Sequence, residues 1–130
     1  AAIHSGDYDA IVCNYANGDM VGHSGKLESA IAAVETLDEC LARLEQAIEA
    51  VSGQMLVTAD HGNVEQMRDP QNDQEHTAHT SNLVPLVYVG GQHINLRPRG
   101  SLCDVAPTLL QLMQLEVPPE MTGKTLIASS

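Results

Sequence analysis

The sequence predicts an α/β protein in which a mainly parallel sheet forms part of a three-layer sandwich, with helices on its faces. Three short apolar runs suit buried strands, and they occur at residues 9–15, 54–58 and 85–89. A long amphipathic pattern lies between the first two runs, and a shorter helical pattern follows the third. Strands that alternate with helices favour parallel pairing, and three strands make only a partial sandwich.

The chain opens with residues 1–5, which are typical of the end of a helix before a turn at Gly6 and Asp7. It has no initiator Met, so we expect a fragment or a processed piece of a longer protein. Residues 9–15 (DAIVCNY) then form a short apolar run with β-branched side chains, which predicts a buried strand.

Residues 26–51 predict one long amphipathic helix. Its apolar side chains recur at steps of three and four residues, at Leu27, Ala30, Ile31, Val34, Leu37, Leu41, Leu44, Ile48 and Val51. The outer positions are acidic and suit a solvated face, at Glu28, Glu35, Asp38, Glu39, Glu45 and Glu49. Gly53 is expected to end the helix.

The second and third strands are expected at residues 54–58 (QMLVT) and 85–89 (PLVYV). Residues 67–75, between them, are polar and predict an exposed loop. Residues 104–113 predict a helix with Asp104 as its N-cap, because a Pro then falls in the first turn, where a missing N–H costs little.

The composition is strongly acidic, with 17 acidic and 6 basic residues and a formal net charge of −11. This speaks against binding to nucleic acid or to an anionic membrane surface, both of which require clustered Lys and Arg. No apolar stretch approaches the roughly 18 residues of a membrane span, and no signal-peptide pattern opens the chain. Cys13, Cys40 and Cys103 predict buried free thiols in a reducing compartment, and hence a cytoplasmic protein.

Two motifs combine a carboxylate with an imidazole. Asp19 and His23, in NGDMVGH, are four residues apart, so one helical turn would place both side chains on one face. Asp60 and His61, in TADHGN, are adjacent, and a loop closed by Gly62 can turn both toward one ion. Taken alone, each motif also suits a structural role, as a helix N-cap with a surface His or as a hydrogen-bonded pair.

A third motif, HTAHT, offers two histidines three residues apart. By residue type alone, His76 and His79 are equally able to bind a metal, and each alone is more often exposed or capping. Asn63 and Glu65 follow the Asp-His pair and are candidates for groups that orient it.

Together the three motifs indicate a metal site, because all lie after or between predicted strands and ligands collect at the carboxyl ends of strands in such sheets. Mixed nitrogen and oxygen donors without thiolate favour Mn²⁺ or Zn²⁺ with open positions. Five ligands are too many for one open catalytic ion and too few for two. The sequence therefore predicts a two-metal site of which this chain holds part.

The same motifs closely resemble those of the cofactor-independent (2,3-bisphosphoglycerate-independent) phosphoglycerate mutases. The matching segments are YANGDMVGH, LVTADHGN and HTAHT, followed by LCDVAPTLL and PEMTGK. The likeness covers nearly the whole chain. That family belongs to the alkaline phosphatase superfamily of two-metal phospho- and sulfotransferases, so the resemblance implies an alkaline-phosphatase-like fold.

The resemblance also implies a role for each ligand. Asp19, His23 and His79 would hold one Mn²⁺, and Asp60 and His61 would hold a second, with Zn²⁺ or another divalent ion as the alternative. From the HTAHT motif it selects the second His, which lies in the family's Ala-His-Thr core.

Residues 1–130 would then be the carboxyl-terminal segment of a metal-binding, phosphatase-like domain. The nucleophilic Ser, a further Asp ligand and the inserted glycerate-binding domain would lie outside this chain, so we expect no catalytic nucleophile here and an inactive isolated chain.

The parent reaction would interconvert 3-phosphoglycerate and 2-phosphoglycerate through a phosphoserine, in glycolysis and gluconeogenesis. The alternatives are a phosphatase or sulfatase of the same superfamily, or a non-enzymatic binding fragment. An uncovered apolar edge or face would favour self-association.

Overall fold

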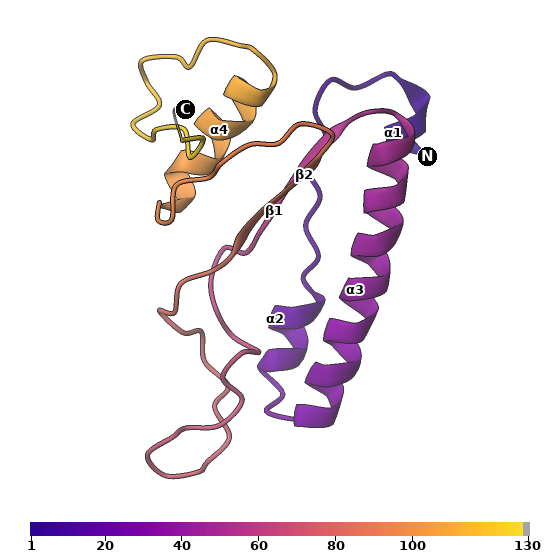
Figure 1. Ribbon diagram of the computed structural model, residues 1–130. Coiled ribbons are helices and arrows are strands. Elements are labelled where there is room, and N and C mark those ends of the chain that lie inside the picture. Colours follow the sequence, from indigo (N-terminus) through magenta and orange to yellow (C-terminus); the bar gives the residue numbers. More distant parts are fainter. Residues whose placement is uncertain (129–130) are drawn as a thin grey trace.

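The computed structural model describes residues 1–128, which form four α-helices, one 3-10 helix and one two-stranded sheet. In chain order the elements are α1 (Ala2–Ser5), α2 (Asn17–Gly22), α3 (Leu27–Ala50), β1 (Gln54–Thr58), β2 (Leu86–Gly90), the 3-10 helix η1 (Leu102–Asp104) and α4 (Val105–Leu112). Figure 1 shows an elongated molecule with α3 along one side. The segment around α4 lies at one end, and α2 lies at the other with the loops that join β1 to β2.

The long helix α3 confirms the predicted amphipathic helix to within one residue at each end. Its acidic positions are exposed, and Ala30 is buried on the opposite face. The helix ends where Ser52 adopts a left-handed backbone with φ of 54° and Gly53 N donates to Ile48 O at 2.8 Å. The predicted stop at Gly53 is therefore correct.

The sheet is antiparallel, so the predicted parallel pairing is wrong. β1 and β2 run in opposite directions, with Gln54 opposite Gly90 and Thr58 opposite Leu86. Parallel neighbours need a crossover, usually a helix, and the connection at residues 59–85 contains none. The chain therefore returns directly beside β1, and the two strand positions are right although their relative direction is not.

Residues 9–15, the first predicted strand, form no strand in the structure. Within residues 1–128 the segment has no ladder partner, and all its side chains are exposed, Val12 to 91%. A strand needs a hydrogen-bonding neighbour and a layer that covers it, and the described residues supply neither. The cysteines are free, but Cys13 and Cys103 are exposed and Cys40 is only half-buried, so their predicted burial is also wrong.

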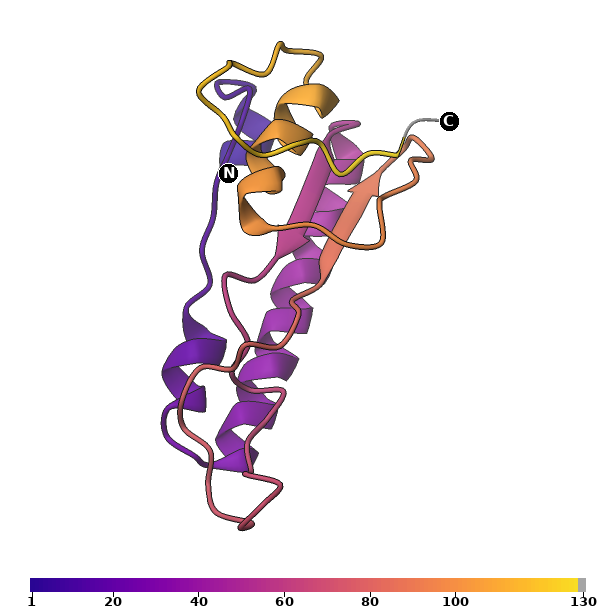
Figure 2. The same ribbon diagram turned by 90° about the vertical axis from the view of Figure 1, so that its left-hand side faces the viewer.

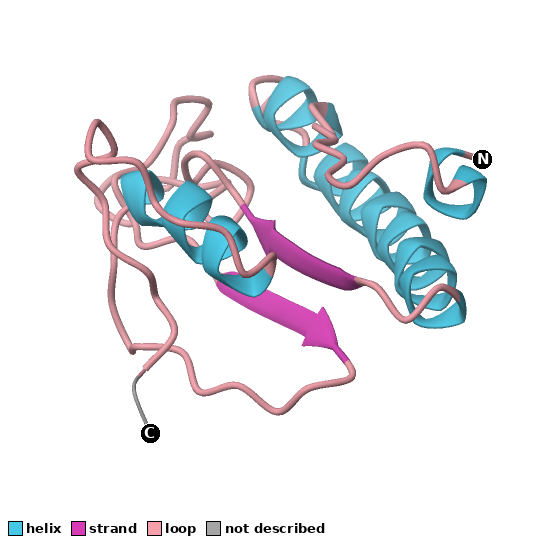
Figure 3. Ribbon diagram, turned by 90° about the horizontal axis from the view of Figure 1, so that it is seen from above, coloured by secondary structure: helices cyan, strands magenta, loops and turns pink. Residues whose placement is uncertain are grey.

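Helices lie on both sides of the small sheet. Figure 2 shows β1 and β2 side by side, and Figure 3 shows α3 on one side of them and α4 on the other. A mixed α/β arrangement is thus present, but with two antiparallel strands it falls short of the predicted sandwich with a mainly parallel sheet. Asp104 is the N-cap residue of α4, as predicted, although its carboxylate accepts from Ser101 N and Lys124 N at 2.9 and 2.7 Å instead of capping α4.

Apolar side chains remain uncovered on the surface of α3. They are Leu27, Ile31 and Val34, which line an open groove together with the buried Ala30 and with Val64. Within residues 1–128, none of the helices combines the length and the apolar character that crossing a bilayer requires.

Candidate metal centre

Asp19 and His23 are positioned by α2, which packs along α3. A Cβ at Gly18 would meet only Leu37, at 3.7 Å, so this side of α2 fits against the long helix without strain. His23 ends the helix one turn after Asp19, and its Nε2 lies 3.2 Å from Asp19 Oδ1. The two side chains share one helical face, as their spacing predicts.

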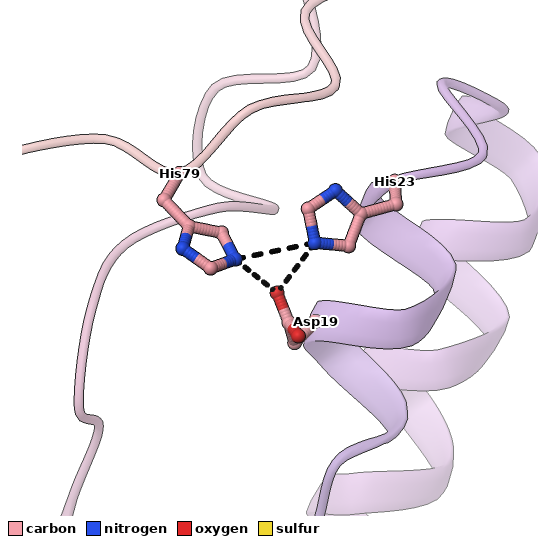
Figure 4. A group of neighbouring side chains, drawn as sticks. All are labelled: Asp19, His23 and His79. Atoms are coloured by element: carbon pink, nitrogen blue, oxygen red, sulfur yellow. Dashed lines mark hydrogen bonds and ion pairs between the residues drawn. The ribbon is translucent and has the colours of Figure 1, made fainter.

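His79 approaches Asp19 from the long connection between the strands. In the antiparallel pair, the end of β1 and the start of β2 lie at the same end of the sheet, so the two halves of this connection meet there. Thr80 N donates to Gly62 O at 2.9 Å where they meet. His79 Nε2 lies 2.8 Å from Asp19 Oδ1 and 3.2 Å from His23 Nε2, as Figure 4 shows.

These three ligand atoms have separations that suit one divalent ion. Atoms about 2.0–2.2 Å from an ion lie roughly 2.8–3.6 Å apart in octahedral or tetrahedral coordination. The separations here are 2.8, 3.2 and 3.2 Å. Within the described part of the chain, Asp19, His23 and His79 are the one group of three or more ligand side chains close enough to share an ion.

The ring of His23 is oriented as that of a metal ligand. Its Nδ1 lies 2.6 Å from the backbone oxygen of Thr77, which can only accept, so Nδ1 carries the proton. In the neutral ring, Nε2 then presents a lone pair toward Asp19 Oδ1. Two facing acceptors repel unless a cation lies between them, and a carbonyl partner on the other ring nitrogen is the usual arrangement of a metal-bound His.

The carboxyl group of Asp19 is ionised at neutral pH. Partial desolvation raises its pKa, but hydrogen bonds from Asn63 and His79 and the nearby imidazoles outweigh that effect and hold the pKa below its ordinary value. The centre therefore offers one negative oxygen and two imidazole nitrogens.

Asp60 and His61 lie beside this group without forming a second one. The His61 ring stacks on His79 with 3.5 Å between centroids, and its Nε2 is 3.9 Å from Asp19 Oδ1 and 3.7 Å from Asp60 Oδ1. The side chain of Asp60 is 84% exposed. His61 thus adjoins both carboxylates, and Asp60 faces outward with room for further ligands.

His76 does not join the centre. Its backbone N donates to Met67 O at 3.0 Å at the base of the exposed loop, and its Nδ1 is buried without a hydrogen-bond partner in the described structure. Of the two histidines in HTAHT, the structure brings His79 to Asp19.

Three residues around the centre were not identified from the sequence. Thr77 contributes only a carbonyl oxygen, which its residue type cannot reveal. Thr80 and Asn82 both donate to Glu65, and the position of Thr80 directly after His79 is the one signal that could have found it. Asn63 and Glu65, both candidates from the sequence, do lie beside the centre.

The comparison with protein families agrees with this set of donors. The chain belongs to the Metalloenzyme superfamily, whose family model matches residues 1–117.

Within that class, the chain is similar to 2,3-bisphosphoglycerate-independent phosphoglycerate mutases. It is 60% identical over 126 residues to that of Salmonella typhi, 62% over 125 residues to that of Cronobacter sakazakii, and 61% over 129 residues to that of Methylobacillus flagellatus. These matches cover 97%, 96% and 98% of this chain but 24%, 24% and 25% of the relatives. The chain therefore spans about a quarter of the length of the curated relatives it matches.

A solved structure supports the same likeness. The phosphoglycerate mutase of Leishmania mexicana, determined at low cobalt concentration, superimposes with a TM-score of 0.88 at 36% sequence identity, over 99% of this chain and 26% of that one. The predicted resemblance to cofactor-independent phosphoglycerate mutases is confirmed.

Proposed function

We propose that these residues are the carboxyl-terminal, metal-binding segment of the phosphatase-like domain of a cofactor-independent phosphoglycerate mutase. The observation that carries the proposal is the group of Asp19, His23 and His79, which combines ligand-compatible separations with a His oriented by a carbonyl. Identity of 60% to a named mutase over 97% of this chain supports the same reaction class for the protein that contains it. The sandwich fold of that domain would be completed by residues outside this chain.

In this proposal Asp19, His23 and His79 hold one divalent ion, and Asp60 and His61 contribute to a second. Nitrogen and carboxylate donors without thiolate suit Mn²⁺, with Zn²⁺ as the alternative. The exposed carboxylate of Asp60 leaves space for ligands from elsewhere in the full-length protein, by which we mean the longest natural chain that contains these residues.

The proposed reaction is the interconversion of 3-phosphoglycerate and 2-phosphoglycerate through a phosphoserine, as a step of glycolysis and gluconeogenesis in the cytoplasm. Bound divalent ions would lower the pKa of the serine hydroxyl and neutralise charge on the transferred phosphoryl group. The residues described here would bind and orient, and the nucleophile would come from outside them. Such a division suits phosphoryl transfer, which depends mainly on positioning and electrostatic stabilisation.

The test compares two histidines of one motif in the full-length protein. His79→Gln should lower mutase kcat/KM by more than about 100-fold, because it removes a ligand, whereas outer-sphere partners typically cost about 10–100-fold. His76→Gln, a matched change three residues away, should leave kcat/KM close to the wild-type value. Chelation should abolish the activity of the wild type, and added Mn²⁺ should restore it.

The reaction product distinguishes a mutase from a phosphatase of the same superfamily. Phosphorus NMR should show 2-phosphoglycerate formed from 3-phosphoglycerate with no accumulation of inorganic phosphate. Release of phosphate as the main product would instead identify a phosphatase, and equal effects of the two His substitutions would contradict the ligand assignment.

A further inference from the structure

The buried side chain of Asn63 contacts the central carboxylate of the candidate centre. Asn63 is 5% exposed, and its Nδ2 donates to Asp19 Oδ1 at 2.9 Å. A carboxylate only accepts hydrogen bonds, so the amide nitrogen must be the atom that faces it. The amide is neutral and does not add to the charge of the centre.

The same oxygen of Asp19 also faces the two imidazoles. A carboxylate oxygen accepts along two lone-pair directions, and Asn63 occupies one of them. The second lone pair of this oxygen points to the side on which His23 and His79 lie. Asn63 thereby determines which oxygen of Asp19 faces the two imidazoles.

Gly22 in helix α2 leaves room for this amide because it has no Cβ. A Cβ at Gly22 would overlap the amide group of Asn63, so only Gly allows Asn63 to pack against the helix one turn beyond Asp19. The Oδ1 of Asn63 is buried there with no hydrogen-bond partner in the described structure. An unsatisfied buried oxygen has a cost, and the hydrogen bond to Asp19 offsets it.

Glu65 holds Asn63 in place and joins it to the other loop. Its Oε2 accepts from Asn63 N at 2.6 Å, while its Oε1 accepts from Thr80 Oγ1 and, at 3.0 Å, from Asn82 Nδ2. Thr80 directly follows His79 in the sequence. The carboxylate of Glu65 lies over Gly62, where a Cβ would overlap it. One side chain thus fixes both loops that deliver groups to Asp19.

We propose that Asn63 and Glu65 are positioning residues that set the ligand geometry of the metal centre, with Gly22 and Gly62 making the space they need. The proposal rests on the proposed function, because it assumes that Asp19 binds a metal. Asn63 orients the Asp19 carboxylate, and Glu65 fixes the backbone of Asn63 together with the residue that follows His79.

Two glycines of α2 provide a matched test in the full-length protein. Gly22→Ala should push the Asn63 amide away from Asp19, whereas Gly18→Ala, in the same helix, adds a Cβ that meets only Leu37 at 3.7 Å. Outer-sphere partners of metal ligands typically contribute about 10–100-fold to affinity, so Gly22→Ala and Asn63→Leu should each raise the Mn²⁺ dissociation constant by about that factor. Gly18→Ala should leave it within about twofold of wild type. Electron paramagnetic resonance of free Mn²⁺ measures these constants.

Two further measurements distinguish a loss of positioning from a loss of folding, and test separately whether Asp19 binds the metal. The metal-free Gly22→Ala variant should melt below Gly18→Ala, because it loses the hydrogen bond from Asn63 to Asp19, but it should still be folded at the temperature of the metal titration. If Asp19→Asn loses Mn²⁺ while Asn63→Leu and Gly22→Ala both bind it as tightly as wild type, the positioning role is wrong and the proposed function stands. If Asp19→Asn itself binds Mn²⁺ with wild-type affinity, the metal assignment fails, and the positioning role with it.

Discussion

At the scale of single residues, Asp19 is the point at which three distant segments meet. Its Oδ1 lies beside His23 of its own helix, accepts from Asn63 of the loop after β1, and contacts His79 of the loop before β2. Asn63 and His79 hydrogen-bond to this carboxylate, which would otherwise be charged and only partly solvated. Because these three side chains share one oxygen of Asp19, a substitution at any of them should alter the positions of the others.

The pH dependence of the Glu65 contacts follows from the direction of its pKa shift. The hydrogen bond from Thr80 is the largest contribution, and with those from Asn82 and Asn63 it outweighs desolvation and lowers the pKa of Glu65 to about 2 from an ordinary 4.5. A carboxyl group whose pKa is lower in the folded state stabilises the protein above its unfolded pKa. That contribution is lost as the pH falls from about 4.5 toward 2.

Glu65→Gln should therefore lower the melting temperature of the metal-free protein by a constant amount above about pH 5, and by less as the pH falls below 4.5. Glu45→Gln, which removes the same charge at an exposed position on α3, serves as a charge control that leaves these hydrogen bonds intact. Calorimetry of both variants from pH 7 to pH 3 measures the difference. A melting-temperature difference that stays the same down to pH 3 would show that the ionised carboxylate does not stabilise the fold.

Part of this centre can be predicted from the sequence, and the rest cannot, because it depends on contacts between distant segments. The pairing of Asp19 with His23 could be predicted because four-residue spacing is a local property of a helix. The place of the HTAHT motif between predicted strands also puts one of its histidines at the site, but the choice of His79 over His76 rests on the family resemblance. The carbonyl of Thr77 and the contact between Thr80 and Glu65 depend on how two loops meet, and no local pattern encodes that meeting.

At the scale of elements, the attachment of the carboxyl-terminal segment to α4 depends on one buried hydroxyl. Thr108 is fully buried, its Oγ1 donates to Asp104 O at 2.7 Å, and it accepts from Leu126 N at 2.8 Å. Thr108→Val keeps the volume but leaves Leu126 N–H buried without a partner. We expect a loss of about 1–3 kcal/mol in the free energy of unfolding.

Thr36→Val is the matched control for that substitution. Thr36 also donates to the carbonyl four residues before it, Ala32 O at 2.8 Å, but it is exposed on α3 and water can replace the bond. Its effect should stay within about 0.5 kcal/mol. Urea unfolding measures both variants, and equal losses would mean that the hydrogen bond to Leu126 contributes nothing.

The elements also show which parts of a fold a sequence can specify. Helix α3 was predictable because its period repeats over many residues and needs no partner to be recognised. The direction of β2 was predicted wrongly because the pairing rule for strands joined by helices does not hold for β1 and β2, whose connection was itself predicted to contain a loop at residues 67–75. Residues 9–15 have the composition of a buried strand, yet burial is a property of what surrounds a segment, and nothing within residues 1–128 covers it.

At the scale of the whole molecule, exposed apolar side chains should make the isolated 130-residue chain self-associate. Val12 is 91% exposed, and Leu27, Ile31 and Val34 line an open groove on α3. The formal net charge of −11 opposes association, so added salt should strengthen it by screening that repulsion. Sedimentation velocity at low and high salt checks this expectation.

Val12→Lys should shift the isolated chain toward the monomer, because it removes exposed apolar surface. Gln71→Lys makes a similar change in charge at an exposed polar position and should have a smaller effect. A strictly monomeric wild-type chain at high concentration and high salt would show that these surfaces are too small or too dispersed to associate.

The isolated chain should also bind divalent metal weakly and show no mutase turnover. Three protein ligands converge at Asp19, which is enough for one ion, whereas Asp60 and His61 alone leave a second ion largely to water. A missing protein ligand removes both a bond and preorganisation, so we expect at most one Mn²⁺ per chain, bound about 10–100-fold more weakly than by the full-length protein. Asp19→Asn should abolish this binding in the isolated chain, and His4→Gln, a substitution outside the centre, should not affect it. Mutase activity from the purified 130 residues would place the nucleophile among them and overturn the proposal that it lies outside.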